Sequence, residues 1–229
     1  VLPETRNGFG PLDVLLHVLG GLIGFSTFYS YSLASMFLWL GFAVVVVAQL
    51  LNIIRLNKVL DVKDVAQMAY YVFGLLWIAW PLAHANVAIN TMTVGGQKFG
   101  CSLLIICLLS AWVGDASAYY TGKNFGKRKA MPTVSPNKTV EGLMGCVGGA
   151  VVLNVVLWAC KTFLQVSWIP PLSVVQFMSI GLIFSTFGAV GDAIESMVKR
   201  IGGIKDSGTF FPGHGGVLDR FDTFFIASA

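Results

Sequence analysis

The sequence predicts an all-α fold, a polytopic transmembrane helical bundle with a polar cavity that faces the cytoplasm. The prediction rests on composition, on the length of the apolar runs and on the distribution of charge along the chain. Of the 229 residues, 55% are hydrophobic and 11% are charged, against about 25% charged residues in an ordinary soluble domain. The mean hydropathy is +0.76. These values exclude a water-soluble globule and also a disordered chain, which needs low hydrophobicity and high net charge.

Apolar segments of membrane-spanning length follow one another along the chain. A spanning helix needs about 20 mainly apolar residues, because the hydrocarbon core is roughly 30 Å thick and a helix rises about 1.5 Å per residue. Residues 32–54 contain no charge and form the clearest span. The first candidate, 12–30, is weaker because Asp13 and His17 lie in its first turns. The remaining predicted spans are 65–85, which is interrupted by Pro81, then 99–121, 138–160 and 172–200.

These segments predict that residues 1–229 form a single integral-membrane domain with about six complete spans plus the start of a seventh. The seventh helix is expected to begin after Gly216, and residues 217–229 are too few to cross a bilayer. We therefore expect a tail that continues beyond Ala229. We likewise expect a chain trimmed at its N-terminus, since it starts at Val1.

The lysines and arginines indicate the orientation of the bundle, since short cytoplasmic loops carry the excess of positive charge. Of the 15 lysines and arginines, all but Lys98 and Lys161 fall on one side when the predicted spans alternate. All 11 acidic residues lie on that side or at the helix ends that face it. This side is therefore taken as cytoplasmic, and polar chemistry is expected there.

Net charge and cysteine usage narrow the possible partners. The formal net charge of +4 is small and dispersed, so nucleic acid is not expected as a partner. The four cysteines show no CxxC spacing, so neither a zinc site nor a disulfide framework is indicated. We expect them to be packing residues.

Two aspartates lie in the predicted spans, although inserting a charged side chain into a membrane costs free energy. Such residues usually mark a function or a buried pair. Asp115 is flanked by small residues, which is also compatible with an interhelical hydrogen bond. Asp192 is followed by Glu195, Ser196 and Lys199 at helical spacings that place all four on one face. This face is either part of a site or a self-satisfied stripe of ion pairs, and the spacing alone does not choose between them.

The segment 196–222 combines cations, carboxylates and glycines, and reads SMVKRIGGIKDSGTFFPGHGGVLDRFD. Asp219 and Asp222 are three residues apart, so both carboxylates face the same way if the segment is helical. Hard oxygen ligands of this kind suit Mg²⁺, which is typically held by one or two carboxylates plus substrate phosphates. Asp192 would complete the site, and Lys199, Arg200 and Lys205 would meet phosphate oxygens.

A second cytoplasmic loop, 122–142, carries a basic cluster and a polar helix entry. Lys127, Arg128 and Lys129 are explained as a topology-setting cluster. The following residues from Ser135 indicate a helix entry that positions Lys138 and Glu141. The later glycines indicate close helix packing. No Walker-type GxxxxGK[ST] occurs, so this is not a P-loop.

Three elements in this order resemble the phosphatidate cytidylyltransferases, also called CDP-diacylglycerol synthases. The elements are Gly114-Asp115-x-x-Ala118-Tyr119, then Ser135-Pro136-x-Lys138-Thr139-x-Glu141-Gly142, then the 196–222 segment that ends in Pro212-Gly213-His214-Gly215-Gly216-Val217-x-Asp219-Arg220-Phe221-Asp222. They make residues of about 112–222 the catalytic part. Residues before this part resemble the family only in being hydrophobic spans.

The resemblance implies a multi-pass membrane enzyme that joins CTP and phosphatidic acid, releases pyrophosphate and requires Mg²⁺. Catalysis would rest on positioning and charge neutralisation, with Glu141 orienting Lys138 toward the phosphates. The implied catalytic residues are Lys138, Glu141, Lys199, Lys205, Asp206, Asp219 and Asp222. The implied substrate-binding residues are Asp115, Ser135, Lys138, Lys199, Arg200, Lys205, His214 and Arg220. The implied metal ligands are Asp192, Ser196, Asp219 and Asp222.

Other functions remain open at this point. A CTP-dependent lipid kinase, or a cytidylyltransferase for another lipid phosphate, would use similar groups near the metal. An ion-coupled transporter would use Asp115 and Asp192 as an ion path, although the acidic residues gather toward one face. A homodimer through Gly20-x3-Gly24 or Gly145-x3-Gly149 is possible. A bacterial inner membrane is the default location, with endoplasmic reticulum and plastid membranes as alternatives.

Overall fold

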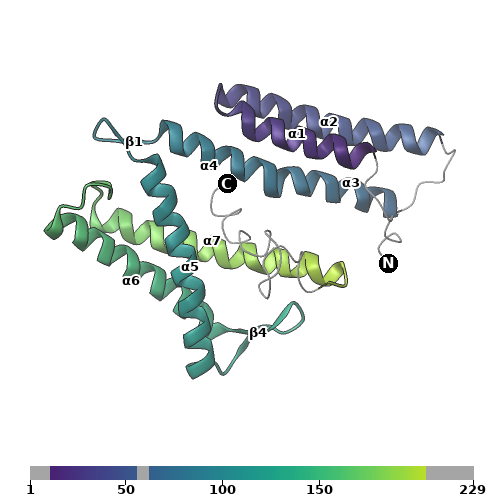
Figure 1. Ribbon diagram of the computed structural model, residues 1–229. Coiled ribbons are helices and arrows are strands. Elements are labelled where there is room, and N and C mark those ends of the chain that lie inside the picture. Colours follow the sequence, from purple (N-terminus) through teal and green to yellow (C-terminus); the bar gives the residue numbers. More distant parts are fainter. Residues whose placement is uncertain (1–10, 56–61, 205–229) are drawn as a thin grey trace. The chain divides into compact units, whose positions relative to one another are not determined.

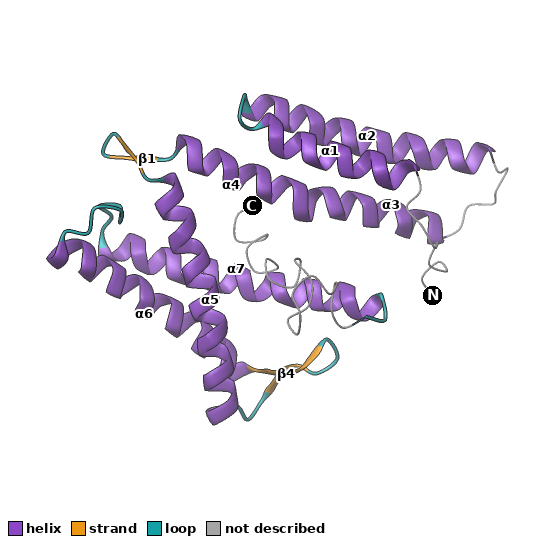
Figure 2. Cartoon of the chain, viewed as in Figure 1, coloured by secondary structure: helices purple, strands orange, loops and turns teal. Residues whose placement is uncertain are grey.

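The computed structural model describes residues 11–55 and 62–204 and is mostly helical. Five helical runs are long and apolar enough to cross a membrane: Tyr31–Leu51, Asp64–Thr91, Gly100–Phe125, Val140–Leu164 and Val174–Ile201. They correspond to the five stronger spans predicted from sequence, which confirms the polytopic helical bundle. Two short hairpins, which the sequence did not predict, are added to the helices (Figure 2). The expected seventh helix lies outside the described residues.

The chain divides into two compact units, one up to Val87 and the other from Ala88. The first unit contains α1 (Pro11–Ser26), α2 (Tyr31–Arg55), α3 (Val62–Gly74), the π-helical turn η1 (Leu75–Ala79) and most of α4 (Trp80–Thr91). The α1 helix has 16 residues and ends before the predicted limit at residue 30. A turn follows the helix, and in it the Thr27 hydroxyl donates a hydrogen bond to the Gly24 carbonyl oxygen at 2.6 Å.

The predicted span with an internal proline is one continuous helical run, and η1 ends two residues before Pro81. A proline lacks the N–H that a helix needs and clashes with the preceding turn. A π-helical turn changes the register of the hydrogen bonds at that point. Leu75 and Ala79 of η1 pack in the core of this unit with Ile23 of α1 and Val45 of α2.

The second unit contains three long helices and both hairpins (Figure 1). The hairpin of β1 (Thr93–Val94) and β2 (Gln97–Lys98) turns through Gly95 and Gly96, whose positive φ angles of 58° and 81° favour glycine. It leads into α5 (Gly100–Phe125). The second hairpin, β3 (Lys129–Met131) with β4 (Ser135–Thr139), connects α5 to α6 (Val140–Leu164). A loop over 165–173 connects α6 to α7 (Val174–Ile201).

Glycines let α5 and α6 approach closely, as the sequence predicted. A Cβ atom at Gly149 would overlap the Ser117 side chain, and one at Gly145 would overlap Thr121. Gly148, on another side of α6, has open space around it. The Gly145-x3-Gly149 pair therefore serves packing inside this chain. Near the other end of the same interface, the buried Asn154 amide donates to Ser110 Oγ at 2.8 Å.

The connections bring one end of each long helix together. The C-terminal end of α5, the N-terminal end of α6 and the C-terminal end of α7 meet beside the β3–β4 hairpin (Figure 1). Lys98 and Lys161, the two cations that the sequence assigned to the far side, lie just before α5 and in the last turn of α6. The polar residues at the near end therefore come from segments far apart in the sequence.

Candidate active site

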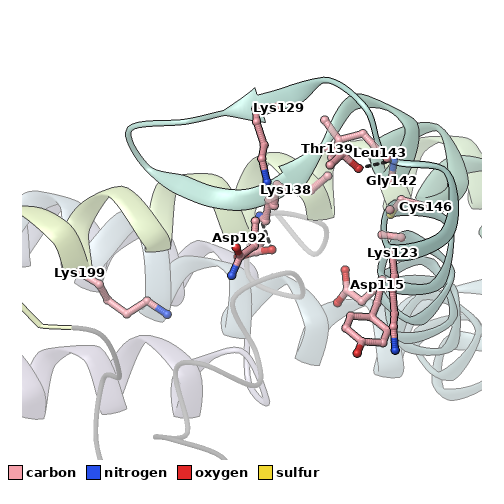
Figure 3. Close-up of a pocket in the computed structure, with 16 residues that line it drawn as sticks. Asp115, Lys123, Lys129, Lys138, Thr139, Gly142, Leu143, Cys146, Asp192 and Lys199 are labelled. Atoms are coloured by element: carbon pink, nitrogen blue, oxygen red, sulfur yellow. Dashed lines mark hydrogen bonds and ion pairs between the residues drawn. The ribbon is translucent and has the colours of Figure 1, made fainter.

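A pocket of about 660 Å³ lies where these helix ends meet the hairpin (Figure 3). This volume falls within the roughly 300–1,000 Å³ typical of small-molecule sites. Four lysines and two aspartates contribute to its walls, so its lining is cationic overall. The lining residues are Asp115, Ala118, Tyr119, Gly122, Lys123, Gly126, Lys129, Asn137, Lys138, Thr139, Gly142, Leu143, Cys146, Ala189, Asp192 and Lys199.

An ion pair joins Lys138 of β4 to Asp192 of α7 at this pocket. Figure 3 shows the two side chains pointing toward each other. Lys138 is fixed in place because the next residue, Thr139, caps α6 by accepting a hydrogen bond from the Gly142 N–H at 3.1 Å. One turn beyond Asp192, the Ser196 hydroxyl donates to Asp192 Oδ1 at 3.3 Å. The side chains of the pair are 23% and 28% exposed, so water screens it only in part.

The polar face of α7 divides into two pairs. Lys199 Nζ lies 2.6 Å from the Glu195 carboxylate, one helical turn away, and Glu195 is buried. Asp192 instead pairs with Lys138 on a different element. The stripe of local ion pairs considered from sequence therefore accounts for Glu195 and Lys199 only. The buried carboxylate of Glu195 anchors Lys199, which lines the pocket.

The α5 wall presents Asp115, Tyr119 and Lys123 at successive turns. Lys123 Nζ lies 5.9 Å from the centre of the Tyr119 ring, within range of a cation–π contact. The sequence analysis identified Asp115 but missed the other two. Tyr119 and Lys123 follow Asp115 at i+4 and i+8. These positions share one face of a helix, so the spacing could have identified both residues.

The region of the hairpin corrects three sequence interpretations. Glu141 does not orient Lys138: its Oε2 accepts from the backbone N–H groups of Lys127 and Arg128 at 3.0 and 3.2 Å, and its Oε1 accepts from Arg128 Nε at 3.2 Å. It thus fixes the loop that precedes β3. Lys129, interpreted as part of a topology-setting cluster, lines the pocket instead. The expected helix entry is a strand, β4, up to Thr139.

The remaining predicted residues are only partly brought together. Ser135 begins β4 and does not line the pocket. Arg200 is exposed, and its Nε donates to Val134 O at 3.4 Å. Six predicted residues lie outside the described residues: Lys205, Asp206, His214, Asp219, Arg220 and Asp222. Within 11–55 and 62–204, no group of three or more His, Cys, Asp or Glu side chains is placed to hold a metal ion.

The class of protein follows from comparison with known sequences. A family model described as the cytidylyltransferase family matches residues 9–229. The chain therefore belongs to this family. Together with the five apolar helices, this makes it a multi-pass membrane protein.

Several similar bacterial proteins carry the name phosphatidate cytidylyltransferase. The one from Bacillus subtilis (strain 168) is 41% identical over 128 residues, which cover 56% of this chain and 45% of the relative. The one from Staphylococcus aureus (strain COL) is 40% identical over 125 residues, 55% of this chain and 45% of the relative. The one from Staphylococcus haemolyticus (strain JCSC1435) is 38% identical over the same shares. The chain thus spans about half the length of the curated relatives it matches.

Proposed function

We propose that the protein transfers the cytidylyl group of CTP to phosphatidic acid, giving CDP-diacylglycerol and pyrophosphate, and that the pocket of unit two is where the phosphates meet. The observation that carries the proposal is that four lysines and two aspartates line one pocket at one end of membrane-length helices. Family membership and the names of the relatives support the same reaction.

The two substrates explain why such a pocket belongs at a membrane interface. CTP is a soluble polyanion, whereas phosphatidate keeps its acyl chains in the bilayer. A pocket at the polar end of spanning helices is accessible to both. Lys123, Lys129, Lys138 and Lys199 approach it from different elements, so together they can offset the charge of two anionic reactants.

The chemical step is a direct displacement at the α-phosphorus of CTP. A phosphate oxygen of phosphatidate attacks roughly in line, and a new P–O bond forms as the bond to the bridging oxygen of the β-phosphate breaks. The electron pair of that bond leaves with pyrophosphate. The nucleophile is already ionised near neutral pH, so no general base is required. The lysines hold the two phosphates together and neutralise their repulsion.

The described residues fit a magnesium ion in part. Asp192 and Ser196 offer two hard oxygen donors that already contact each other. We propose that Asp192 and Ser196 hold Mg²⁺ together with Asp219 and Asp222, as the sequence motif implies. When bound, the ion would withdraw charge from the phosphate oxygens of CTP. Lys138 shares the Asp192 carboxylate, so it lies beside the proposed metal position and can reach the same phosphates.

The other predicted residues take supporting parts in this proposal. Lys205, Arg220 and His214 would contact phosphates from the segment after α7. Asp206 would act in the same segment, and Ser135 and Arg200 would act at the hairpin end. Glu141 supports the site indirectly, through the loop that it fixes. The bacterial relatives support a bacterial cell membrane as the location.

The test is an assay of the full-length protein in detergent with labelled CTP and phosphatidic acid, with and without Mg²⁺, beside Asp192→Asn. We expect a lipid-soluble cytidine product and stoichiometric pyrophosphate, both lost on chelation and in the variant. Release of CDP with a phosphorylated lipid would identify a lipid kinase instead. Absence of any nucleotide turnover, in protein that is folded and given Mg²⁺, would overturn the proposal.

A further inference from the structure

A second cavity, almost wholly apolar, lies against the lysine-lined pocket. It is a groove of about 370 Å³ between the β3–β4 hairpin, α6 and α7. Met131 and Val134 of the hairpin form one side of it, and Val147 of α6 and Ile194 of α7 are among the residues of the other sides. Its lining contains no charged side chain, in contrast to the pocket beside it.

The groove and the pocket share part of their walls. Leu143 of α6 and Ala189 of α7 line both cavities. Figure 3 shows Leu143 beside the polar residues at the start of α6. A ligand that passes this boundary meets lysines on one side and an almost wholly apolar lining, with Thr186 as its one hydroxyl side chain, on the other. The combined site is therefore amphipathic over a distance of a few side chains.

We propose that this groove holds the first part of an acyl chain of the lipid acceptor, while the phosphate of the same lipid lies in the lysine-lined pocket. This inference rests on the proposed function and adds the position of the lipid to it. The chemistry selects the occupant, because a phosphate ester of a diacylglycerol is one molecule with an anionic end and an apolar end. The lysines match the first end, and the groove matches the second.

The groove differs from ordinary lipid-facing surface in how it is built. Two of its residues, Met131 and Val134, belong to the hairpin rather than to a spanning helix. Arg200 of α7 donates to Val134 O, which holds the tip of the hairpin against α7. The hairpin thus supplies an apolar wall on the groove side, and its Lys129 and Lys138 supply cations on the pocket side. One element therefore aligns both ends of the lipid.

The first test fills the groove and compares the KM values of the two substrates. Ala193 lines the groove but not the pocket, and Ala193→Phe places a bulky ring there. Each methylene kept out of an apolar site costs roughly a factor of four in affinity. We expect the KM for dioleoyl phosphatidate to rise about tenfold or more, with the KM for CTP unchanged. Ala116→Phe, at an exposed position of α5 outside both cavities, is the matched control.

The second test does not depend on turnover or on the variant folding. A phosphatidate with a photoreactive diazirine in its acyl chain is irradiated with the wild-type protein, and the labelled peptides are mapped by mass spectrometry. We expect label on the segments that contain Val147 and Ile194, removed by excess dioleoyl phosphatidate but not by dioleoyl phosphatidylcholine.

The outcomes separate this inference from the proposed function. Wild-type protein that makes no cytidine lipid would remove the function, and the inference with it. An active enzyme whose KM for dioleoyl phosphatidate does not change in Ala193→Phe would overturn the groove alone. The groove would also be overturned if phosphatidylcholine removed the label as well as phosphatidate does, because this would indicate contact with bulk lipid. Label confined to other helices would overturn it too.

Discussion

The two units use polar side chains in opposite ways. In the first unit they join helices to one another: the Tyr71 hydroxyl donates to Asp13 Oδ1 at 2.8 Å, and Asn86 donates to Thr27 Oγ1. In the second unit, polar side chains from α5, the hairpin and α7 converge on one pocket. An aspartate in an apolar helix therefore joins two helices in one unit and lines a pocket in the other. What separates the two cases is convergence on a cavity, not the presence of the charge.

Breaking the central pair should produce the largest effect. Lys138→Met removes the cation that pairs with Asp192 and that we propose contacts the substrate phosphates. We expect kcat to fall about 10²- to 10³-fold, the range seen when one preorganised transition-state contact is removed. Lys138→Arg keeps the charge and should restore part of the rate. Steady-state kinetics with CTP and phosphatidate measure both, and an unchanged kcat in Lys138→Met would remove this residue from the site.

Packing between α5 and α6 should give the next largest effect. Gly149→Ala forces a Cβ against Ser117, so we expect a loss of about 1–3 kcal/mol of stability despite the better helix propensity of alanine. Gly148→Ala meets open space and should be neutral or stabilising by up to about 1 kcal/mol. Thermal unfolding in detergent compares the two variants. Equal unfolding midpoints for the two variants would show that α5 and α6 do not pack closely at Gly149.

A smaller effect is expected from the hairpin lysines. Lys129→Gln removes an exposed cation that lines the pocket, and Lys127→Gln removes an exposed neighbour that does not. We expect the KM for CTP to rise up to about fivefold in the first variant, since an exposed charge pair contributes at most about 1 kcal/mol. The second variant should match the wild type. The reverse order of KM values would restore the topology-setting interpretation of Lys129.

The first unit should give the smallest change. Tyr71→Phe removes the hydrogen bond to Asp13, and such bonds between membrane helices contribute about 0.6 kcal/mol on average. We expect a slight fall in the unfolding temperature and unaltered KM values for both substrates. A loss of turnover larger than the loss of folded protein would mean that this unit also takes part in catalysis.

Sequence patterns predicted the helices well because membrane insertion requires long apolar runs. They predicted Asp115, Lys138, Asp192 and Lys199 as site residues, and all four line one pocket. They did not predict the β3–β4 hairpin, because its three- and five-residue strands carry polar residues without a clear alternation. Because the hairpin was not predicted, nothing in the sequence indicated that Lys129 lines the pocket.

Other differences arose from partners that are distant in sequence or beyond the described residues. The family resemblance implied that Glu141 orients Lys138, but the chain turns so that its carboxylate accepts hydrogen bonds from the Lys127 and Arg128 backbone. Pairing across elements, as in Lys138 and Asp192, depends on tertiary packing that spacing does not encode. The roles of Asp219 and Asp222 stay predictions.

The most direct test of the account is calorimetric binding of CTP with Mg²⁺ to three forms of the full-length protein: wild type, Asp192→Asn and Asp13→Asn. Both aspartates accept a hydrogen bond from a neighbouring side chain, but only Asp192 lines the pocket. The account predicts that Asp13→Asn binds as the wild type does, whereas Asp192→Asn binds at least about tenfold more weakly, a loss of about 1.4 kcal/mol or more. Wild-type affinity in Asp192→Asn, or loss of binding in Asp13→Asn alone, would contradict it.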